Sequence, residues 1–211
     1  MQIPSMETLD LHGKRTMIRL DLNVPIKNGA VISDARIMAS LPTIKMALDK
    51  GANVILLSHL GRPDPDNIDG SFSLEPVAER LKEILGIKVS FQSNWLEGID
   101  HPSDGITLCE NVRYHAGEKK NDESLSQKIA GLCDVYVMDA FGASHRKHSS
   151  TYGALQFAKE RCIGPLLSNE VNSIKKAIDG PKSPVTAIIG GAKVSSKLGV
   201  IEKFSSFCDH V

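Results

Sequence analysis

Four short segments each join an apolar or β-branched run to a loop that carries arginine beside aspartate, asparagine or histidine. They read RLDLNVP at 19–25, SHLGRP at 58–63, ENVRYH at 110–115 and DAFGASHRKH at 139–148. Guanidinium groups suit phosphate and carboxylate because their planar fork donates two parallel hydrogen bonds. The four segments therefore predict a binding site for a small anion.

The first segment combines a strand pattern with polar residues. A two-residue alternation puts Arg19, Asp21 and Asn23 on one face. Aspartate and asparagine are poor strand formers, so their presence there needs a reason. Two interpretations stay open: they satisfy backbone groups at a strand end, or they form a row of hydrogen-bonding groups for a substrate hydroxyl and carboxylate.

The second and third segments add a histidine and two arginines. His59 and Arg62 lie on a tight turn after the apolar run VILLS, and Gly61 permits an unusual backbone angle there. An isolated histidine is more often structural than catalytic, but His59 together with Arg62 favours anion binding. Arg36 and Arg113 have a second interpretation, as solvated surface charges or ion-pair partners.

The fourth segment places Arg146 between His145 and His148. Two histidines raise the alternative of a zinc site. No cysteine lies close by, however, and the ligand spacing does not fit zinc. We therefore expect no metal site in this chain, and we assign Arg146 to the anion site.

A fifth segment, IIGGAKVSSK, lies near the end of the chain. Gly190 and Gly191 follow a predicted strand and open a predicted helix that carries Lys193 and Lys197. Glycine lets the backbone approach a phosphate, and a helix N-terminus favours negative charge. The segment is neither a Walker A loop nor a GxGxxG fingerprint. Two lysines on one helix face are, taken alone, usually just solvent-facing.

Strand-like and helix-like segments alternate along the chain and would position these loops. This alternation is typical of a parallel, Rossmann-like α/β sheet with helices on both faces. The predicted strands are 15–20, 53–58, 87–91, 106–109 and 134–139. Ligands of such sheets bind outside the carboxyl ends of the strands, where these loops would converge.

Four helices are predicted between and after the strands. The first has Pro42 in its first turn and stops at Gly51, and the second is capped by Ser73 and ends at Gly86. The third follows the polar run EKKNDES. Both the first and the third helix carry apolar residues at helical spacing. In the first helix these are Ile37, Leu41, Ile44 and Leu48. In the third they are Leu125, Ile129 and Leu132. The fourth helix spans about 165–179.

The Gly/Pro break DGPKSP follows the fourth helix and predicts a domain boundary. Beyond it come a predicted strand, VTAIIGG, and a predicted helix, VSSKLGVIEKFSSF. One βα unit of this kind is too small to bury its own faces. We expect an N-terminal domain at 1–163, an interdomain helix at 164–180, and the start of an incomplete second α/β domain at 181–211.

Composition restricts the class of protein. Lys plus Arg and Asp plus Glu are both 25 among 211 residues, so the net charge is zero. A balanced charge argues against nucleic-acid and membrane-surface binding. The 4 cysteines are scattered, which favours a reducing compartment. No secretory signal or membrane-spanning apolar run is present in the sequence, and we expect a cytoplasmic protein.

The five segments, in this order and spacing, resemble phosphoglycerate kinase. The resemblance rests on RLDLNVP, SHLGRP, ENVRY, DAFGASHR and GGAKVSSK and extends over essentially the whole chain. It implies two α/β domains joined by a long helix, with the triose on the first and MgATP on the second. The match covers the first domain, the helix and the opening of the second domain. It further implies a mostly monomeric full-length protein.

The resemblance also implies a role for each candidate residue. Asp21 and Asn23 resemble the contacts to the hydroxyl and carboxyl end of 3-phosphoglycerate, and Arg36 resembles the arginine that faces the carboxyl oxygen accepting the phosphoryl group. The residues that resemble its phosphate cradle are His59, Arg62, Arg113 and Arg146. One departure is Tyr114, where the family commonly has phenylalanine.

Lys193 resembles the lysine that stabilises the phosphoryl group in transit. Lys197 resembles a contact to the ATP phosphates, with Gly190 and Gly191 beside it. The Mg²⁺ bound with ATP or ADP would find its ligand outside these 211 residues.

The implied reaction is reversible transfer of a phosphoryl group between 1,3-bisphosphoglycerate and MgADP. Two hypotheses remain. The chain is a piece of a longer kinase, or it is a non-catalytic short form that binds phosphometabolites. In either case we expect these 211 residues to bind 3-phosphoglycerate without turnover.

Overall fold

The computed structural model describes residues 4–100, 105–179, 183–191 and 197–211. The chain divides into two compact units: unit 1, which extends to Glu170, and unit 2, Val171–Val211. The domain limits predicted from the sequence, at 163/164 and 180/181, stay a prediction.

Unit 1 is built on a parallel six-stranded sheet with the strand order β5-β6-β4-β1-β7-β8. Every neighbouring pair in it is parallel. Its strands are β1 (Arg15–Arg19), β4 (Asn53–Leu57), β5 (Lys88–Gln92), β6 (Gly105–Cys109), β7 (Val135–Met138) and β8 (Glu160–Ile163). The Rossmann-like sheet predicted from the sequence is confirmed. The edge strand β8 was not predicted.

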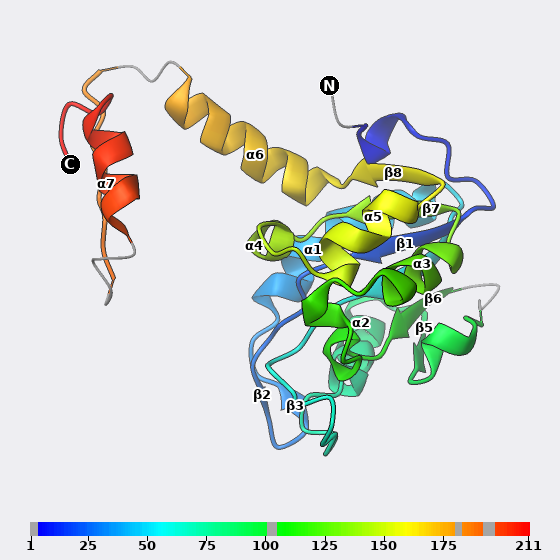
Figure 1. Cartoon of the computed structure of the whole chain (residues 1–211). Helices are drawn as coiled ribbons and strands as arrows, with labels where there is room; N and C mark the ends of the chain where they lie inside the picture. Colours follow the sequence, from blue (N-terminus) through cyan, green and yellow to red (C-terminus); the bar gives the residue numbers. More distant parts are fainter. Residues whose placement is uncertain (1–3, 101–104, 180–182, 192–196) are drawn as a thin grey trace. The chain divides into compact units, whose positions relative to one another are not determined.

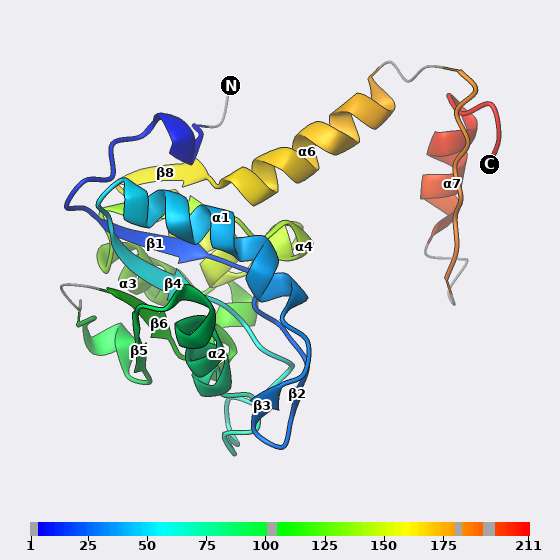
Figure 2. The ribbon, with the colours of Figure 1, turned by 180° about the vertical axis from the view of Figure 1, so that it is seen from behind.

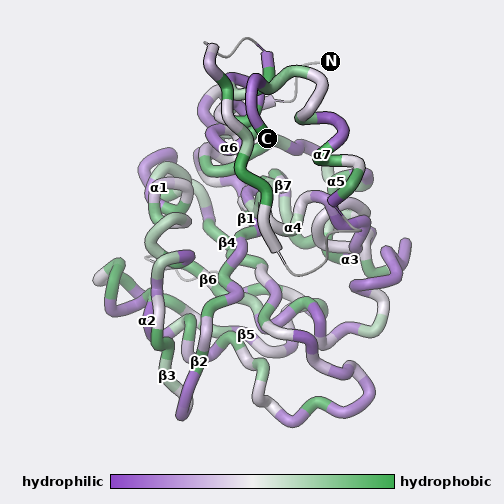
Figure 3. The backbone as a smooth tube through the Cα atoms, turned by 90° about the vertical axis from the view of Figure 1, so that its left-hand side faces the viewer, coloured by the Kyte–Doolittle hydropathy of each residue, from purple (hydrophilic) through white to green (hydrophobic). Residues whose placement is uncertain are grey.

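Helices cover both faces of this sheet. Figure 2 shows α1 (Ala35–Asp49) and α2 (Glu75–Leu85) over one face. Figure 1 shows α3 (Glu123–Gly131) and α5 (Ala154–Phe157) over the other. Figure 3 looks along these layers, with the strands between the two sets of helices. Unit 1 therefore has the three layers of an α/β fold.

Shorter elements complete unit 1. They are the hairpin β2 (Ile26–Lys27) and β3 (Ala30–Val31), helix α4 (Phe141–Ser144), the 3₁₀ turns η1 (Met6–Thr8), η2 (Trp95–Glu97), η3 (Val112–Tyr114) and η4 (Glu118–Lys120), and the π-helical turn η5 (Ser149–Gly153). Three of these, η3, η4 and η5, carry residues of the candidate site.

Alternation along the strands creates two cores. In β1, Ile18 joins the cluster that contains Ile44 of α1 and Leu81 of α2. Met17, its neighbour, joins the opposite cluster with Ile129 of α3. Each fully buried aliphatic side chain contributes about 1.5–3 kcal/mol. Because both faces are covered, the central strands are apolar at nearly every position, and this core fixes the sheet edge from which the site loops emerge.

Two details of the helices differ from the sequence prediction. α1 begins at Ala35, so Pro42 lies inside the helix and not in its first turn. The ring of Pro42 faces the exposed side, between the buried residues Leu41 and Thr43, and the helix continues through it. Leu74, not Ser73, is the N-cap of α2. The Ser73 hydroxyl nevertheless accepts a hydrogen bond from the Glu75 N–H at 3.2 Å.

The fourth predicted helix is α6 (Pro165–Ile178). Its first turn is held in unit 1 by the buried carboxylate of Asp139, whose Oδ1 accepts the Leu167 N–H at 2.8 Å. Across the part of the chain that the structure describes, no helix is both long and apolar enough to cross a membrane.

Unit 2 contains the remainder of α6 and helix α7 (Leu198–Ser205). In place of the strand predicted at 185–191, the described residues 183–191 form only an isolated parallel bridge, between Thr186 and His210. A strand needs neighbouring strands to satisfy its backbone groups, and unit 2 offers only the few residues around His210.

Candidate anion-binding site

The four arginine-bearing segments follow four adjacent strands. RLDLNVP leaves β1, SHLGRP leaves β4, ENVRYH leaves β6 and DAFGASHRKH leaves β7, and these strands are consecutive in the sheet as β6-β4-β1-β7. Because the strands are parallel, their carboxyl ends lie at one edge. The sequence-predicted convergence of these loops on one sheet edge is therefore present.

Arg19 and His59 form the buried centre of this edge. Arg19 is 1% exposed and His59 is 4% exposed. The guanidinium of Arg19 donates from Nε to Ser150 Oγ at 2.9 Å and from Nη1 to the carbonyl of Leu20. Its Nη2 lies 3.1 Å from His59 Nδ1. Arg19 thus uses three of its N–H groups on the protein itself.

The pKa of the His59 imidazole is lowered to about 2, first by burial and then by the charges of Arg19, Arg113, Arg146 and Arg36. His59 is therefore neutral at neutral pH. Burial, with the nearby Arg146 and Arg19, also lowers the pKa of Arg113 to about 10. Arg113 still carries its charge at neutral pH. Positive groups have been brought together here at an electrostatic cost that a bound anion would relieve.

Arg113 has an unpaired donor. The residue is only 6% exposed, and its Nη1 donates to the carbonyl of Gly61. Its Nε is buried and has no hydrogen-bond partner among the described residues. A buried unpaired donor costs about 1–3 kcal/mol, and more when the group is charged. A ligand oxygen would satisfy this N–H.

Asn111 orders the two loops that carry His59 and Arg113. Its Oδ1 accepts the N–H groups of Leu60 at 3.1 Å and of Arg113 at 3.0 Å. Its Nδ2 donates to the carbonyls of Leu60 at 2.8 Å and of Phe72 at 2.9 Å. Asn111 is fully buried. One amide therefore ties both loops to the chain near Phe72.

Asp21 and Asn23 also contact protein groups. Arg36 donates from Nη1 to Asp21 Oδ2 at 2.6 Å, and the Arg36 side chain is 51% exposed. Asn23 Oδ1 accepts the Gly61 N–H at 2.9 Å. For Asn23 this contact agrees with the interpretation in which polar residues satisfy backbone groups. The substrate-contact interpretation of Asp21 and Asn23 stays a prediction.

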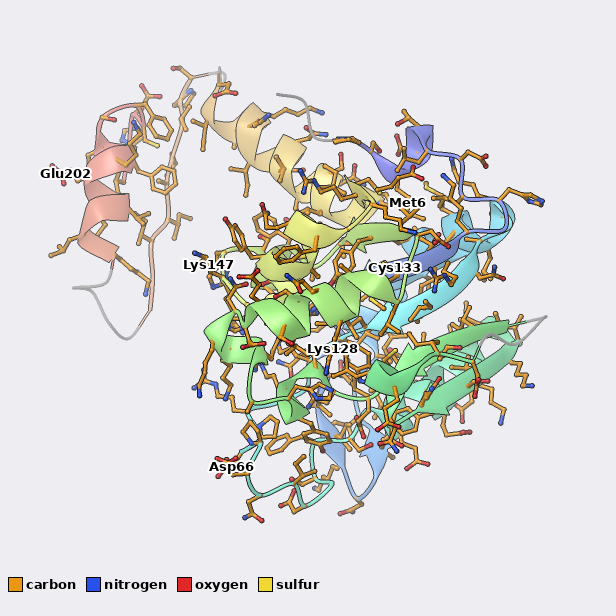
Figure 4. The ribbon with its side chains drawn as sticks, turned by 45° about the vertical axis from the view of Figure 1, so that its right-hand side comes forward. Met6, Asp66, Lys128, Cys133, Lys147 and Glu202 are labelled. Carbon is orange, nitrogen blue, oxygen red and sulfur yellow. The ribbon has the colours of Figure 1, made fainter. Side chains whose placement is uncertain are left out.

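The guanidinium groups of the two remaining arginines of the site are not used by other described residues. Arg62 is exposed and Arg146 is half-buried. Within the described residues, neither guanidinium makes a hydrogen bond or an ion pair. Lys147, labelled in Figure 4, marks the loop after α4 that also carries Arg146. Both arginines lower the pKa of Arg113, which indicates that they lie near it.

The nucleotide-binding candidates lie in unit 2. Gly191 has a φ of +133°, and a Cβ added there would lie 2.1 Å from Lys197 Nζ. The ammonium group of Lys197 is therefore close to the backbone of Gly191, and any side chain at this position would displace it. Gly190 is exposed and immediately precedes this contact. Lys193 lies outside the described residues.

Sequence reasoning missed two residues beneath the arginines, Glu118 and Ser150. Glu118 is 1% exposed. Its Oε1 accepts the Ser150 hydroxyl at 2.6 Å and its Oε2 accepts the Ser150 N–H at 2.9 Å. Burial raises the pKa of Glu118, while the charge of Arg19 and the bonds from Ser150 oppose that shift. Glu118 stands in a run of charged residues, EKKNDES, which reads as an exposed loop.

Comparisons with known proteins agree on one family. A sequence model described as "Phosphoglycerate kinase" matches residues 6–211. The chain is 51% identical over 209 residues to a phosphoglycerate kinase of Legionella pneumophila (strain Lens), covering 99% of this chain and 53% of that protein. It is 50% identical over 211 residues to that of Nitratidesulfovibrio vulgaris (strain DSM 19637 / Miyazaki F), covering 100% and 54%.

Solved structures give the same result. Phosphoglycerate kinase from Coxiella burnetii superposes with a TM-score of 0.92 at 45% identity, covering 99% of this chain and 53% of that one. The enzyme from Pyrococcus horikoshii OT3 gives a TM-score of 0.83 at 30% identity, covering 96% and 52%. The chain thus spans about half the length of the relatives that it matches.

Proposed function

The chain belongs to the phosphoglycerate kinase family, and from this we propose that unit 1 is the part of such an enzyme that binds 3-phosphoglycerate. The whole enzyme would move a phosphoryl group reversibly between 1,3-bisphosphoglycerate and MgADP, giving 3-phosphoglycerate and MgATP. The observation that carries the proposal is the buried, unpaired Nε of Arg113. It lies at the sheet edge to which His59 and three further arginine loops converge.

In this proposal the phosphate of the triose accepts hydrogen bonds from His59, Arg62, Arg113 and Arg146. Arg62 and Arg146 have guanidinium groups that the described residues do not use, so they are available to a ligand. Asp21 and Asn23 would hold the hydroxyl and carboxyl end.

Arg36 would face the carboxyl oxygen that accepts the phosphoryl group. Its contact with Asp21 at 2.6 Å would hold it in place until substrate arrives. In the second unit, Lys193 would stabilise the phosphoryl group in transit, and Gly190, Gly191 and Lys197 would contact the nucleotide phosphates.

Enzymes that transfer a phosphoryl group do little covalent chemistry themselves and act mainly by positioning and electrostatic stabilisation. The residues of this chain would align the acceptor carboxylate and place positive charge over the transferred oxygens. Arg36, in unit 1, and Lys193, in the second unit, would both supply this charge.

Magnesium would enter with the nucleotide and neutralise phosphate charge. In the part of the chain that the structure describes, no three histidine, cysteine, aspartate or glutamate side chains come together as a metal site. The protein ligand of this ion would lie outside these residues, as the resemblance implies, and we assign no step of the reaction to the ion here.

We further propose that the 211-residue polypeptide binds 3-phosphoglycerate without turning it over, because it spans about half of its relatives. Isothermal calorimetry with millimolar 3-phosphoglycerate tests binding. We expect heat from the unaltered chain and an affinity at least about tenfold lower for Arg113→Gln, because a charged hydrogen bond contributes roughly 1.5–3 kcal/mol. The matched control is Arg161→Gln, since among the described residues the Arg161 side chain donates a hydrogen bond only to the carbonyl of Leu155.

Absence of heat from the unaltered chain, or an equal loss in both variants, would contradict the binding proposal. A coupled ATP assay tests the second half: turnover at a rate normal for a kinase would refute binding without catalysis. We also propose a cytoplasmic location and a monomeric full-length protein. Light scattering of that protein would test the second of these.

A further inference from the structure

A buried network of four side chains lies beneath the arginine loops. It consists of His59, Arg19, Ser150 and Glu118, and all four are at most 4% exposed. Three of them come from distant parts of the sequence: Arg19 and Ser150 are 131 positions apart, and Arg19 and His59 are 40 apart. The network continues from Ser150 to Glu118 of η4 through two hydrogen bonds.

The direction of each hydrogen bond in this network is fixed by chemistry. Arginine has N–H donors and no acceptor, so His59 Nδ1 must accept from Arg19 Nη2 across 3.1 Å. Ser150 Oγ likewise accepts from Arg19 Nε at 2.9 Å. The one hydroxyl proton of Ser150 is therefore available to Glu118 Oε1, 2.6 Å away.

We propose that Glu118 and Ser150 are positioning residues that act through Arg19 to hold His59 in the tautomer with its proton on Nε2. His59 then offers an N–H donor to an anion at the sheet edge, and only this last clause rests on the proposed function. With the proton on Nδ1 instead, two donors would face each other across the contact with Arg19, and Nε2 would present a lone pair to the anion.

Glu118 is suited to this task by its charge as well as its contacts. Burial, with the charge of Arg146, lowers the pKa of the Arg19 guanidinium, and the carboxylate of Glu118 opposes this shift. His148 Nδ1 lies 3.8 Å from Glu118 Oε1, too far for a direct hydrogen bond. Both carboxylate oxygens are thus engaged by Ser150. Glutamine would keep the size of Glu118 but would turn one of its two acceptors into a donor facing Ser150.

The imidazole ¹⁵N signals of His59 in the ligand-free protein test the tautomer directly. We expect a single Nε2–H pattern in the unaltered chain. We expect its partial or complete loss in Glu118→Gln and in Ser150→Ala. The control is Ser149→Ala: Ser149 is also fully buried, but within the part of the chain that the structure describes its hydroxyl donates only to the carbonyls of Gly117 and Asp122. If Glu118→Gln does not fold, Ser150→Ala and its control decide.

An Nδ1–H pattern in the unaltered chain would overturn the proposal. An unchanged pattern in the variants would do the same, and so would an equal change in Ser149→Ala, which would point to lost packing. Affinity for 3-phosphoglycerate should fall roughly tenfold in the two network variants and stay unchanged in the control. If the unaltered chain shows the Nε2–H pattern but does not bind 3-phosphoglycerate, the proposed function fails while the positioning role of Glu118 and Ser150 stands.

Discussion

Replacing Asn111 by alanine should loosen the anion site and unit 1 together. The side chain makes four hydrogen bonds, all to backbone groups of Leu60, Phe72 and Arg113, at 2.8–3.1 Å. Alanine makes none of them and leaves a small space where the amide stood. Because Asn111 is fully buried, bulk water does not reach these backbone groups without local rearrangement.

The expected magnitude follows from this count. A typical protein hydrogen bond contributes about 1 kcal/mol net, so four of them amount to about 4 kcal/mol. Water that enters the vacated space would recover part of this, and we expect a loss of about 3 kcal/mol. With a urea dependence of about 2 kcal/mol per molar, the unfolding midpoint should fall by about 1.5 M.

Tryptophan fluorescence in urea measures this change in the stability of unit 1. The chain contains 1 tryptophan, Trp95, which is fully buried in the same core cluster as Val112. It contacts the ring of His115 edge-on with centroids 5.2 Å apart. Its emission therefore reports the unfolding of unit 1.

The control for Asn111→Ala is Asn67→Ala. Asn67 is exposed, and its backbone N–H, not its side chain, donates a hydrogen bond to the carbonyl of Asp64. The free energy of unfolding of Asn67→Ala should stay within about 0.5 kcal/mol of that of the unaltered chain. A loss below about 1 kcal/mol for Asn111→Ala would refute the inference that this amide holds the loops. Affinity for 3-phosphoglycerate should fall in parallel with stability.

Two further perturbations test the loops and the base of the sheet. Gly61→Ala should destabilise unit 1 in urea by about 1–3 kcal/mol more than Gly70→Ala. Both have positive φ, +57° and +77°, but only at Gly61 would the new Cβ meet a side chain, Phe72 Cδ1 at 2.1 Å. Hydrogen bonds from Arg15 lower the pKa of Asp134 to about 2 from 3.8. The contribution of this ion pair to the free energy of unfolding is fully present above pH 3.8 and is lost as the pH falls through about 2. Because the pair is about one-third exposed, Asp134→Asn should remove only about 1 kcal/mol at neutral pH. Equal costs for the two glycines, or an unchanged acid titration in Asp134→Asn, would contradict these expectations.

The sequence predicted the central strands well because both faces of the sheet are covered. Residues such as Ile18 and Met17 are both apolar, so β1 reads as a continuous run. The edge strand β8 was missed because its sequence, ERCI, begins with two charged residues that tolerate an edge position. Pro42 was misplaced because burial of neighbours such as Leu41 and Thr43 offsets the cost of a proline inside the helix.

Residue type could identify the arginines of the site. It could not show which of them donate their hydrogen bonds to protein groups instead of a ligand. Arg19 directs its donors to Ser150, His59 and the Leu20 carbonyl, and nothing near it in the sequence predicts this. Glu118 was missed for the same reason, because its burial depends on Ser150, 32 positions later. Long-range polar contacts of this kind follow from the fold and not from local periodicity.

The central place of β1 in the sheet also matters while the polypeptide is being synthesised. β1 pairs with β4 on one side and with β7 on the other, and Arg15 meets Asp134 across 119 positions. One edge of β1 therefore stays open until residues of β7 have left the ribosome. An open apolar strand edge is a template for aggregation, and pairing over such separations is slow. Nascent chains that stop short of β7 should thus aggregate more readily than chains that extend past it.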